Sequence, residues 1–195
     1  MTRRDSLLAL GTLATTMPFT LHAQEYKGAL IIETDHEESR FKIGKDAFLL
    51  RPNTKIALEH DGVFTKALSL LGGGAMAVFG GGEKKVHTKT FTAGIRGTGI
   101  YLQEYANDMV YSCLCYGKAD YHAPLSSELL LSLEAIHHDK PIQVVKTSKG
   151  KLEYYEYHEP NHSDDELRRL EKMCGREVPF EAYLKEKSVK TPYKR

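Results

Sequence analysis

The sequence predicts a mainly β protein that ends in a short α-helix, and three observations support this. Short runs rich in apolar and β-branched residues recur over residues 27–121, and turn-forming residues separate them about every 8–12 residues. A clear helix start appears only at residue 163. Hydrophobic residues make up 41% of the chain, which is enough to build a core and excludes wholesale disorder. We therefore expect a β-sandwich or a solenoid-like β-domain with a C-terminal helix.

The expected strands are short and are bounded by glycine, proline, asparagine and aspartate. They cover 28–34, 40–43, 47–50, 55–59, 68–71, 75–79, 88–92, 99–105, 109–116, 142–147 and 151–157. Asp61-Gly62 is typical of a tight hairpin. We divide this part of the chain into a β-domain over 27–121 and further strands with a His-rich segment over 122–162. The stretch 129–138 is predicted to be a strand or a short helix.

The helix signal is a capping box, in which the side chain of Ser163 bonds the backbone of Glu166 and the side chain of Glu166 bonds back. Acidic residues fill the first turn and basic residues follow, as the helix dipole favours. Gly175 ends the predicted helix. The remaining Lys-rich stretch is typical of a solvated terminus, so we expect 163–195 to be one helix followed by a basic tail.

Residues 1–23 have the form of a secretory signal peptide. Arg3 and Arg4 precede a short apolar stretch at 7–14, and a small residue stands at the expected cleavage position. The paired arginines also resemble a twin-arginine export signal, but Ser6 replaces the usual bulky apolar residue, so both export routes stay open. We expect the mature protein in a bacterial periplasm, where disulfides are permitted.

The charge balance excludes a nucleic-acid binder that works through a global basic field. The chain has 27 Lys and Arg against 26 Asp and Glu, which gives a net charge of +1. No apolar run reaches the roughly 20 residues of a membrane-spanning helix, so we expect no transmembrane segment in the mature chain. Because the protein is expected to be exported, its expected partner is a cell-envelope protein.

One strand segment carries a family resemblance. The run 92–101 contains Arg96-Gly97-Thr98, with further glycines on both sides. This run resembles the signature of the FecR-domain family, and the resemblance covers about residues 30–120. The upstream stretches that fit the same pattern are 39–44, 49–56 and 70–78.

The resemblance implies an extracytoplasmic all-β module. In the namesake members of the family, this module relays a signal from an outer-membrane receptor to a sigma factor. The sequence shows neither a cytoplasmic helical anti-sigma segment nor a transmembrane helix to connect one, so we expect an exported module that acts alone. Arg96, Gly97 and Thr98 are expected to be structural, with the Arg96 guanidinium buried and forked onto carbonyls or a carboxylate.

Two cysteines at alternate positions are the strongest candidates for chemistry. Cys113 and Cys115 lie in a predicted strand, so their side chains project to the same face and can bind one soft cation together. The candidates for further ligands are His137, His138 and His162. Adjacent histidines face opposite ways in a strand, so we expect only one of the first two to join the site. Zinc and iron are the candidate metals.

Two other interpretations of the cysteines stay open. Cys174 is able to form a disulfide with Cys113 or Cys115 in an oxidising compartment, or the thiols are inert buried groups. No catalytic constellation stands out in the sequence. The predicted function is therefore a non-catalytic periplasmic FecR-like binding, scaffold or signalling module. The alternative is a metal-binding protein with a structural or sensory site. A metal-dependent enzyme is less favoured, because it needs an open coordination position and a general base.

Overall fold

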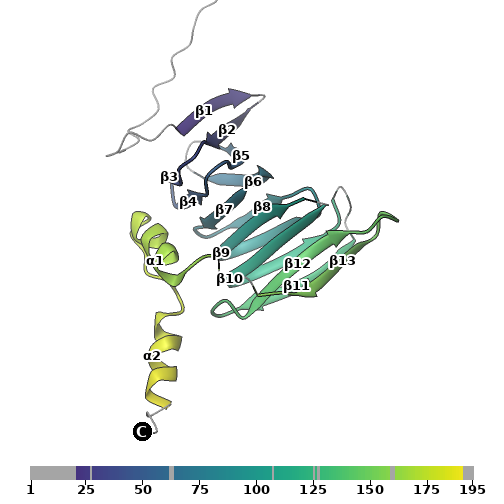
Figure 1. Ribbon diagram of the computed structural model, residues 1–195. Helices are drawn as coiled ribbons and strands as arrows, with labels where there is room; N and C mark the ends of the chain where they lie inside the picture. The colour runs from purple at the N-terminus through teal and green to yellow at the C-terminus, as the bar shows by residue number, and fades with distance from the viewer. Residues whose placement is uncertain are drawn as a thin grey trace, which may run out of the picture.

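The structure is a computed structural model that describes residues 21–26, 28–61, 64–106, 108–124, 126, 128–158 and 161–190. Its strands form one hydrogen-bonded sheet of 13 strands, and two helices follow at the C-terminal end (Figure 1). The strands are β1 (Leu21–Tyr26), β2 (Ala29–Thr34), β3 (Ser39–Ile43), β4 (Asp46–Leu50), β5 (Lys55–His60), β6 (Thr65–Gly72), β7 (Gly74–Val78), β8 (Glu83–His87), β9 (Thr92–Tyr105), β10 (Met109–His122), β11 (Leu129–Ala135), β12 (Lys140–Lys146) and β13 (Leu152–Glu156). The helices are α1 (Asp164–Met173) and α2 (Glu181–Lys190). This architecture confirms the predicted mainly β fold with a helical C-terminus.

The two long strands β9 and β10 organise the sheet. They pair with each other along most of their length, but each has different outer neighbours at its two ends. In β9, residues 92–96 pair with β8, whereas residues 99–103 pair with β7. In β10, residues 109–114 pair with β12, whereas residues 117–122 pair with β11. The sheet therefore has two halves that share the β9–β10 pair.

Glycines stand where this pair passes from one half to the other. Gly97 in β9 and Gly117 in β10 both have positive φ, +54° and +97°, a conformation that favours glycine. A Cβ atom on Gly117 would lie 2.7 Å from the carbonyl oxygen of Gly97, so the two backbones approach too closely for a side chain. The ladder also shifts register on either side of Tyr116. These features let one pair of strands serve both halves of the sheet.

Two apolar clusters form on opposite faces of the half that contains β4, β7 and the first part of β10. The larger cluster includes Phe48, Leu50, Ile100 and Leu114 from this half, and it also draws residues from β2, β5, β6 and β8 in the other half. The smaller cluster lies on the outer face. Its sheet residues are Ala47, Leu49, Met76, Val78, Tyr101, Tyr111, Cys113, Cys115 and Tyr116, and its C-terminal residues are Leu167, Leu170, Val178 and Phe180. We call residues 161–184, which cover this outer face, the C-terminal cap.

The helix that begins the cap has the predicted start and end. Ser163 is the N-cap of α1, and both bonds of the capping box with Glu166 are present. The helix ends at Met173, and Gly175 follows with a φ of +70°. The helix α2 was not predicted, because its Lys-rich sequence resembles a solvated tail. In the part of the chain that the structure describes, no helix is both long and apolar enough to cross a membrane.

Several strand boundaries differ from the prediction. The strand β9 begins at Thr92 and not at 99, and β10 continues to His122 and does not end at 116. The strand expected at 88–92 lies earlier, at β8, and a turn follows it. The Thr88 side chain holds this turn by accepting hydrogen bonds from the backbone of Thr90 and Phe91. The stretch 129–138 is a strand only as far as Ala135, and its last residues form a turn.

The predicted signal peptide falls mainly on residues 1–20, which lie outside the described residues, as do Gly62 of the predicted hairpin and the end of the tail at 191–195. Residues 21–23, the last part of the predicted signal peptide, belong to β1, which pairs with β2.

The prediction of a buried arginine fork in the family signature is wrong. The side chain of Arg96 is 73% exposed and its guanidinium lies 3.4 Å from Glu83, because the Arg96 side chain points to solvent where the strand bends. The structural contacts come instead from buried Thr98. Its hydroxyl donates to the backbone oxygen of Arg96 at 2.8 Å and approaches that of Lys118 at 3.3 Å. The signature therefore stabilises the bend through Gly97 and Thr98.

Candidate metal site

The two cysteines project from β10 onto the outer face of the sheet. Cys113 and Cys115 are 1% and 0% exposed, and both belong to the apolar cluster under the C-terminal cap. Leu114, between them, points the other way into the larger core. This alternation is the period of two that the sequence predicted for a strand. The two thiols therefore lie side by side in a buried place, with Cys115 Sγ 3.5 Å from the carbonyl oxygen of Cys113.

His138 reaches the cysteines from the turn between β11 and β12. These strands pair with different parts of β10, so the turn passes directly over the middle of that strand. The backbone N–H of His138 donates to the carbonyl oxygen of Cys115 at 3.0 Å. A φ of +47° at His138 turns its ring inward, and Nδ1 lies 3.5 Å from Cys113 Sγ.

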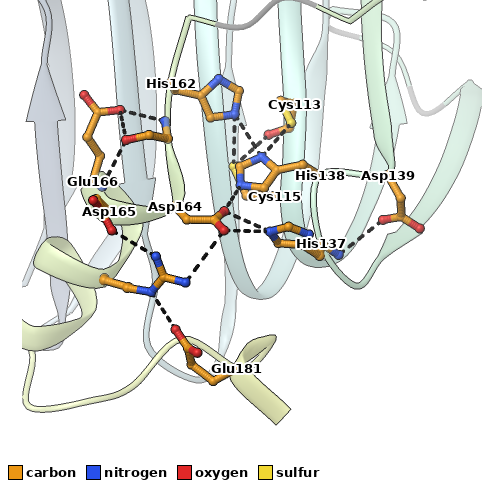
Figure 2. Close-up of polar contacts among 12 residues, drawn as sticks. Cys113, Cys115, His137, His138, Asp139, His162, Asp164, Asp165, Glu166 and Glu181 are labelled. Carbon is orange, nitrogen blue, oxygen red and sulfur yellow. Dashed lines mark hydrogen bonds and ion pairs between the residues drawn. The ribbon is translucent and has the colours of Figure 1, made fainter. Parts of the chain in front are cut away.

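His162 reaches the same place from the start of the cap. It directly precedes Ser163, the N-cap of α1, and its ring stacks on Tyr101 with centroids 4.6 Å apart and planes 9° apart. Its Nε2 atom lies 3.7 Å from Cys115 Sγ and 3.1 Å from Nδ1 of His138. Figure 2 shows the two imidazoles and the two thiols converging on one point.

The separations of these four donor atoms match a tetrahedral metal site. The two sulfurs and two nitrogens all lie within 4.8 Å of one another. With Zn–S bonds of about 2.3 Å and Zn–N bonds of about 2.0–2.1 Å, the edges of a tetrahedron are about 3.4–3.8 Å. The observed edges of 3.5, 3.7 and 3.1 Å lie close to that range before any ion draws the ligands into place.

The second nitrogen of each imidazole lies beside an oxygen. Nδ1 of His162 lies 2.9 Å from Oδ1 of Asn161 in a hydrogen bond, whereas Nε2 of His138 lies 3.1 Å from Oδ1 of Asp164 in an ion-pair contact that lacks hydrogen-bond geometry. An imidazole nitrogen that donates to an acceptor carries the proton, so Nδ1–H of His162 leaves the lone pair of its Nε2 atom facing Cys115. Metal binding through Nδ1 of His138 requires the proton of that ring to lie on Nε2, beside Asp164. Histidines that bind metals in proteins show this arrangement.

His137 does not join the four donors. Its Nε2 atom lies 2.9 and 3.0 Å from the two carboxylate oxygens of Asp164. The prediction that only one of the adjacent histidines joins the cluster agrees with the structure, but the stated reason is wrong. These residues lie in a turn and not in a strand, and the inward backbone twist at His138 makes the choice.

Asp164 is the residue of the site that the sequence analysis missed. Its carboxylate contacts both His137 and His138, and Arg168 lies 3.7 Å from it on the next turn of α1. In the sequence, Asp164 has the pattern of a first-turn acidic residue that favours the helix dipole and pairs with Arg168 four residues later. The one sequence feature that indicates its place in the site is its position two residues after His162.

Contacts within the cluster shift the pKa values of Cys113, Cys115 and His138. The hydrogen bond from Cys115 lowers the pKa of Cys113 to about 3, and His138 and His162 act in the same direction against the effect of burial. Burial, followed by the hydrogen bond and charge of Cys113, raises the pKa of Cys115. Burial lowers the pKa of His138, but contacts with Cys113 and Asp164 outweigh it and leave that pKa raised. These contacts favour the thiolate form of Cys113, and the thiolate is the form of cysteine that binds metals.

An ion pair beside the cluster fixes the cap segment that carries His162. The guanidinium of Arg51 lies 2.6 Å from Glu166 and 3.0 Å from Glu38, and it donates to the backbone oxygen of Asn161 at 2.8 Å. Burial disfavours the charge of Arg51, but hydrogen bonds to Glu166 and Tyr101 raise the pKa of Arg51 above its ordinary value. This arginine thus holds both the N-terminal turn of α1 and the residue before His162.

The third cysteine belongs to a different place. Cys174 is the C-cap residue of α1, at the opposite end of that helix from His162. All three cysteines lie in the described part of the chain, and each is a free thiol. A cavity of about 730 Å³ is also remote from the cluster. It is lined by residues of β5, β6 and β8 and by the turn before β8, and by none of the four donors.

Comparisons with known proteins support the fold. No known family profile matches the chain, and no curated protein matches it. Two solved structures from Parabacteroides distasonis, each described as a candidate anti-sigma factor, are similar. One is 15% identical with a TM-score of 0.53, over 66% of this chain and 60% of that chain. The other is 16% identical with a TM-score of 0.51, over 65% of this chain and 59% of that chain. The likeness spans less than two thirds of those chains and establishes similarity of fold.

Proposed function

We propose that this protein is an exported FecR-like binding or signalling module that holds one zinc ion through Cys113, Cys115, His138 and His162. One observation carries the metal part of the proposal. Two sulfurs and two nitrogens lie within 4.8 Å of one another, in a buried place. These residues lie in three separate segments of the sequence, and the fold brings them together. Their sulfur and imidazole donors are of the types that zinc prefers.

The donor set favours zinc over iron as the bound metal. Two thiolates and two imidazoles in tetrahedral arrangement form a common structural zinc site, and all four positions are filled by the protein. A catalytic zinc keeps one position for water or substrate, so this set supports a structural or sensory role. The proposal therefore includes no catalysis.

The module part of the proposal has separate support. The FecR-like signature around Arg96, the predicted export signal and the mainly β fold are consistent with a domain that works in the periplasm on a cell-envelope protein. The two similar solved structures are described as candidate anti-sigma factors, which is consistent with a signalling role.

Metal analysis of the purified protein tests the zinc site. We expect about one zinc per chain after dialysis against metal-free buffer, because a closed four-ligand site releases its ion slowly. Cys113→Ser should reduce the zinc content to a small fraction of that value. Cys174→Ser is the matched control and should retain zinc, because this thiol lies at the other end of α1. Less than about 0.1 metal per chain in the unmodified protein would contradict the proposal.

A further inference from the structure

The four candidate ligands join two separate parts of the fold. Cys113, Cys115 and His138 belong to the sheet and its β11–β12 turn, whereas His162 belongs to the C-terminal cap. We propose that zinc occupancy controls the docking of this cap onto the outer face of the sheet. The inference rests on the proposed zinc site and adds a regulatory role to it.

The apolar contact between the cap and the sheet is small. In the cap, four side chains are fully buried against the sheet, namely Leu167, Leu170, Val178 and Phe180. Beyond them α2 extends away from the sheet, and residues 185–187 are exposed (Figure 1). Burial of these four side chains must offset the entropy of ordering more than twenty residues. Polar links add to this contact, among them the bonds of Arg51 to Glu166 and of Tyr116 to Glu171, and the donor cluster is a further one.

Beside the Arg51 ion pair, the N-terminal end of the cap has a second link, whose strength depends on what lies between the donors. The two facing nitrogens of His138 and His162 are 3.1 Å apart, and the second nitrogen of each ring faces an oxygen of Asp164 or Asn161. These two nitrogens share one hydrogen bond, so one of them carries a proton. Zinc replaces this single contact with four bonds, three to the sheet side and one to the cap.

Zinc that binds only the docked arrangement stabilises it by mass action, by an amount that grows with the logarithm of the ratio of free zinc to the dissociation constant. Removal of zinc then shifts the cap toward an undocked state. Undocking uncovers a contiguous apolar surface on the sheet, formed by Leu49, Met76, Val78, Tyr101 and Tyr111. Zinc occupancy therefore decides how much of this apolar surface is exposed.

Hydrogen–deuterium exchange of the full chain, followed by mass spectrometry, tests this inference. After a chelator removes zinc, we expect peptides over residues 164–174 to exchange at least about tenfold faster, while peptides over β9 stay unchanged. Added zinc should restore the original exchange. His162→Ala should exchange in the cap at the zinc-free rate whether or not zinc is added. His158→Ala, at an exposed position outside the cluster, is the control and should behave as the unmodified protein does.

The possible outcomes separate the inference from the proposed function. Equal cap exchange with and without bound zinc would overturn the inference and leave the zinc site standing. Loss of protection in β9 together with the cap would also overturn it, because zinc would then hold the whole fold. A chain that binds no zinc would overturn both.

Discussion

The Nε2 atom of His162 lies 3.1 Å from the Nδ1 atom of His138, although the two residues are 24 positions apart in the chain. Each of these nitrogens also faces a cysteine sulfur on β10. The contact brings together the turn between β11 and β12 and the segment that leads into α1. The proposed zinc site and the proposed control of the cap both follow from this meeting of three segments.

Replacement of Asp164 tests the role of the residue behind His138. Asp164→Asn removes the carboxylate that faces Nε2 of His138, and we expect zinc affinity to fall by about 10–100-fold while the four ligands remain. A competition titration with a chromophoric chelator measures this affinity. Asp165→Asn is the matched control, because it changes the same charge in the same helical turn but its carboxylate contacts Arg168. Equal affinities of the two variants would contradict the role given to Asp164.

The ion pair between Arg51 and Glu166 predicts a loss of stability in acid. Burial raises the pKa of Glu166, but the hydrogen bonds and charge of Arg51 and the hydrogen bonds of Ser163 together outweigh it, so this pKa is lowered in the folded protein. A group with a lowered folded pKa contributes stability above its unfolded pKa, near about 4.3, and loses this contribution as pH falls through the folded value. We expect Glu166→Gln to cost about 1–2 kcal/mol of unfolding free energy at pH 7 and progressively less below pH 4.

Urea denaturation at several pH values checks this prediction. Glutamine preserves the capping box with Ser163, so the variant isolates the charge of Glu166. Glu186→Gln, on exposed α2, serves as a comparison. A stability difference between Glu166→Gln and the unmodified protein that does not shrink in acid would show that the ion pair does not act as described.

The bend in the β9–β10 pair predicts a large effect of one methyl group. Gly117→Ala places a Cβ atom 2.7 Å from the backbone oxygen of Gly97 and forces alanine to a φ of +97°, so we expect a loss of at least about 1–3 kcal/mol in unfolding free energy. Gly94→Ala is the control within β9, because nothing lies within 4 Å of its added Cβ atom. Thermal or chemical denaturation compares the two. A Gly117→Ala protein as stable as Gly94→Ala would mean that the bend does not require glycine.

The sequence predicted those parts of the site that depend only on residues a few positions apart. Cys113 and Cys115 share a face because alternate residues of a strand do so, and the capping box at Ser163 depends on four consecutive residues. The position of His138 was not predictable in this way. It depends on a turn that crosses from one half of the sheet to the other, and on a left-handed backbone conformation in a residue other than glycine.

Features that depend on distant packing were also missed. Asp164 has the same local pattern as any acidic residue in a first helical turn, and its contact with His138 exists only because the cap folds back onto the sheet. Arg96 was expected to be buried because its neighbours are glycines and apolar residues, but its side chain lies on the solvent side of the bend. In both cases the decisive fact is which surface another part of the chain covers.

X-ray absorption at the zinc edge of the zinc-loaded protein tests the central proposal most directly. We expect a first shell of two sulfurs at about 2.3 Å and two nitrogens at about 2.0–2.1 Å, with the pattern of imidazole at longer range. Cys115→Ser should replace one sulfur by a lighter atom. A first shell of oxygen and nitrogen alone, unchanged in Cys115→Ser, would contradict a zinc site at Cys113, Cys115, His138 and His162.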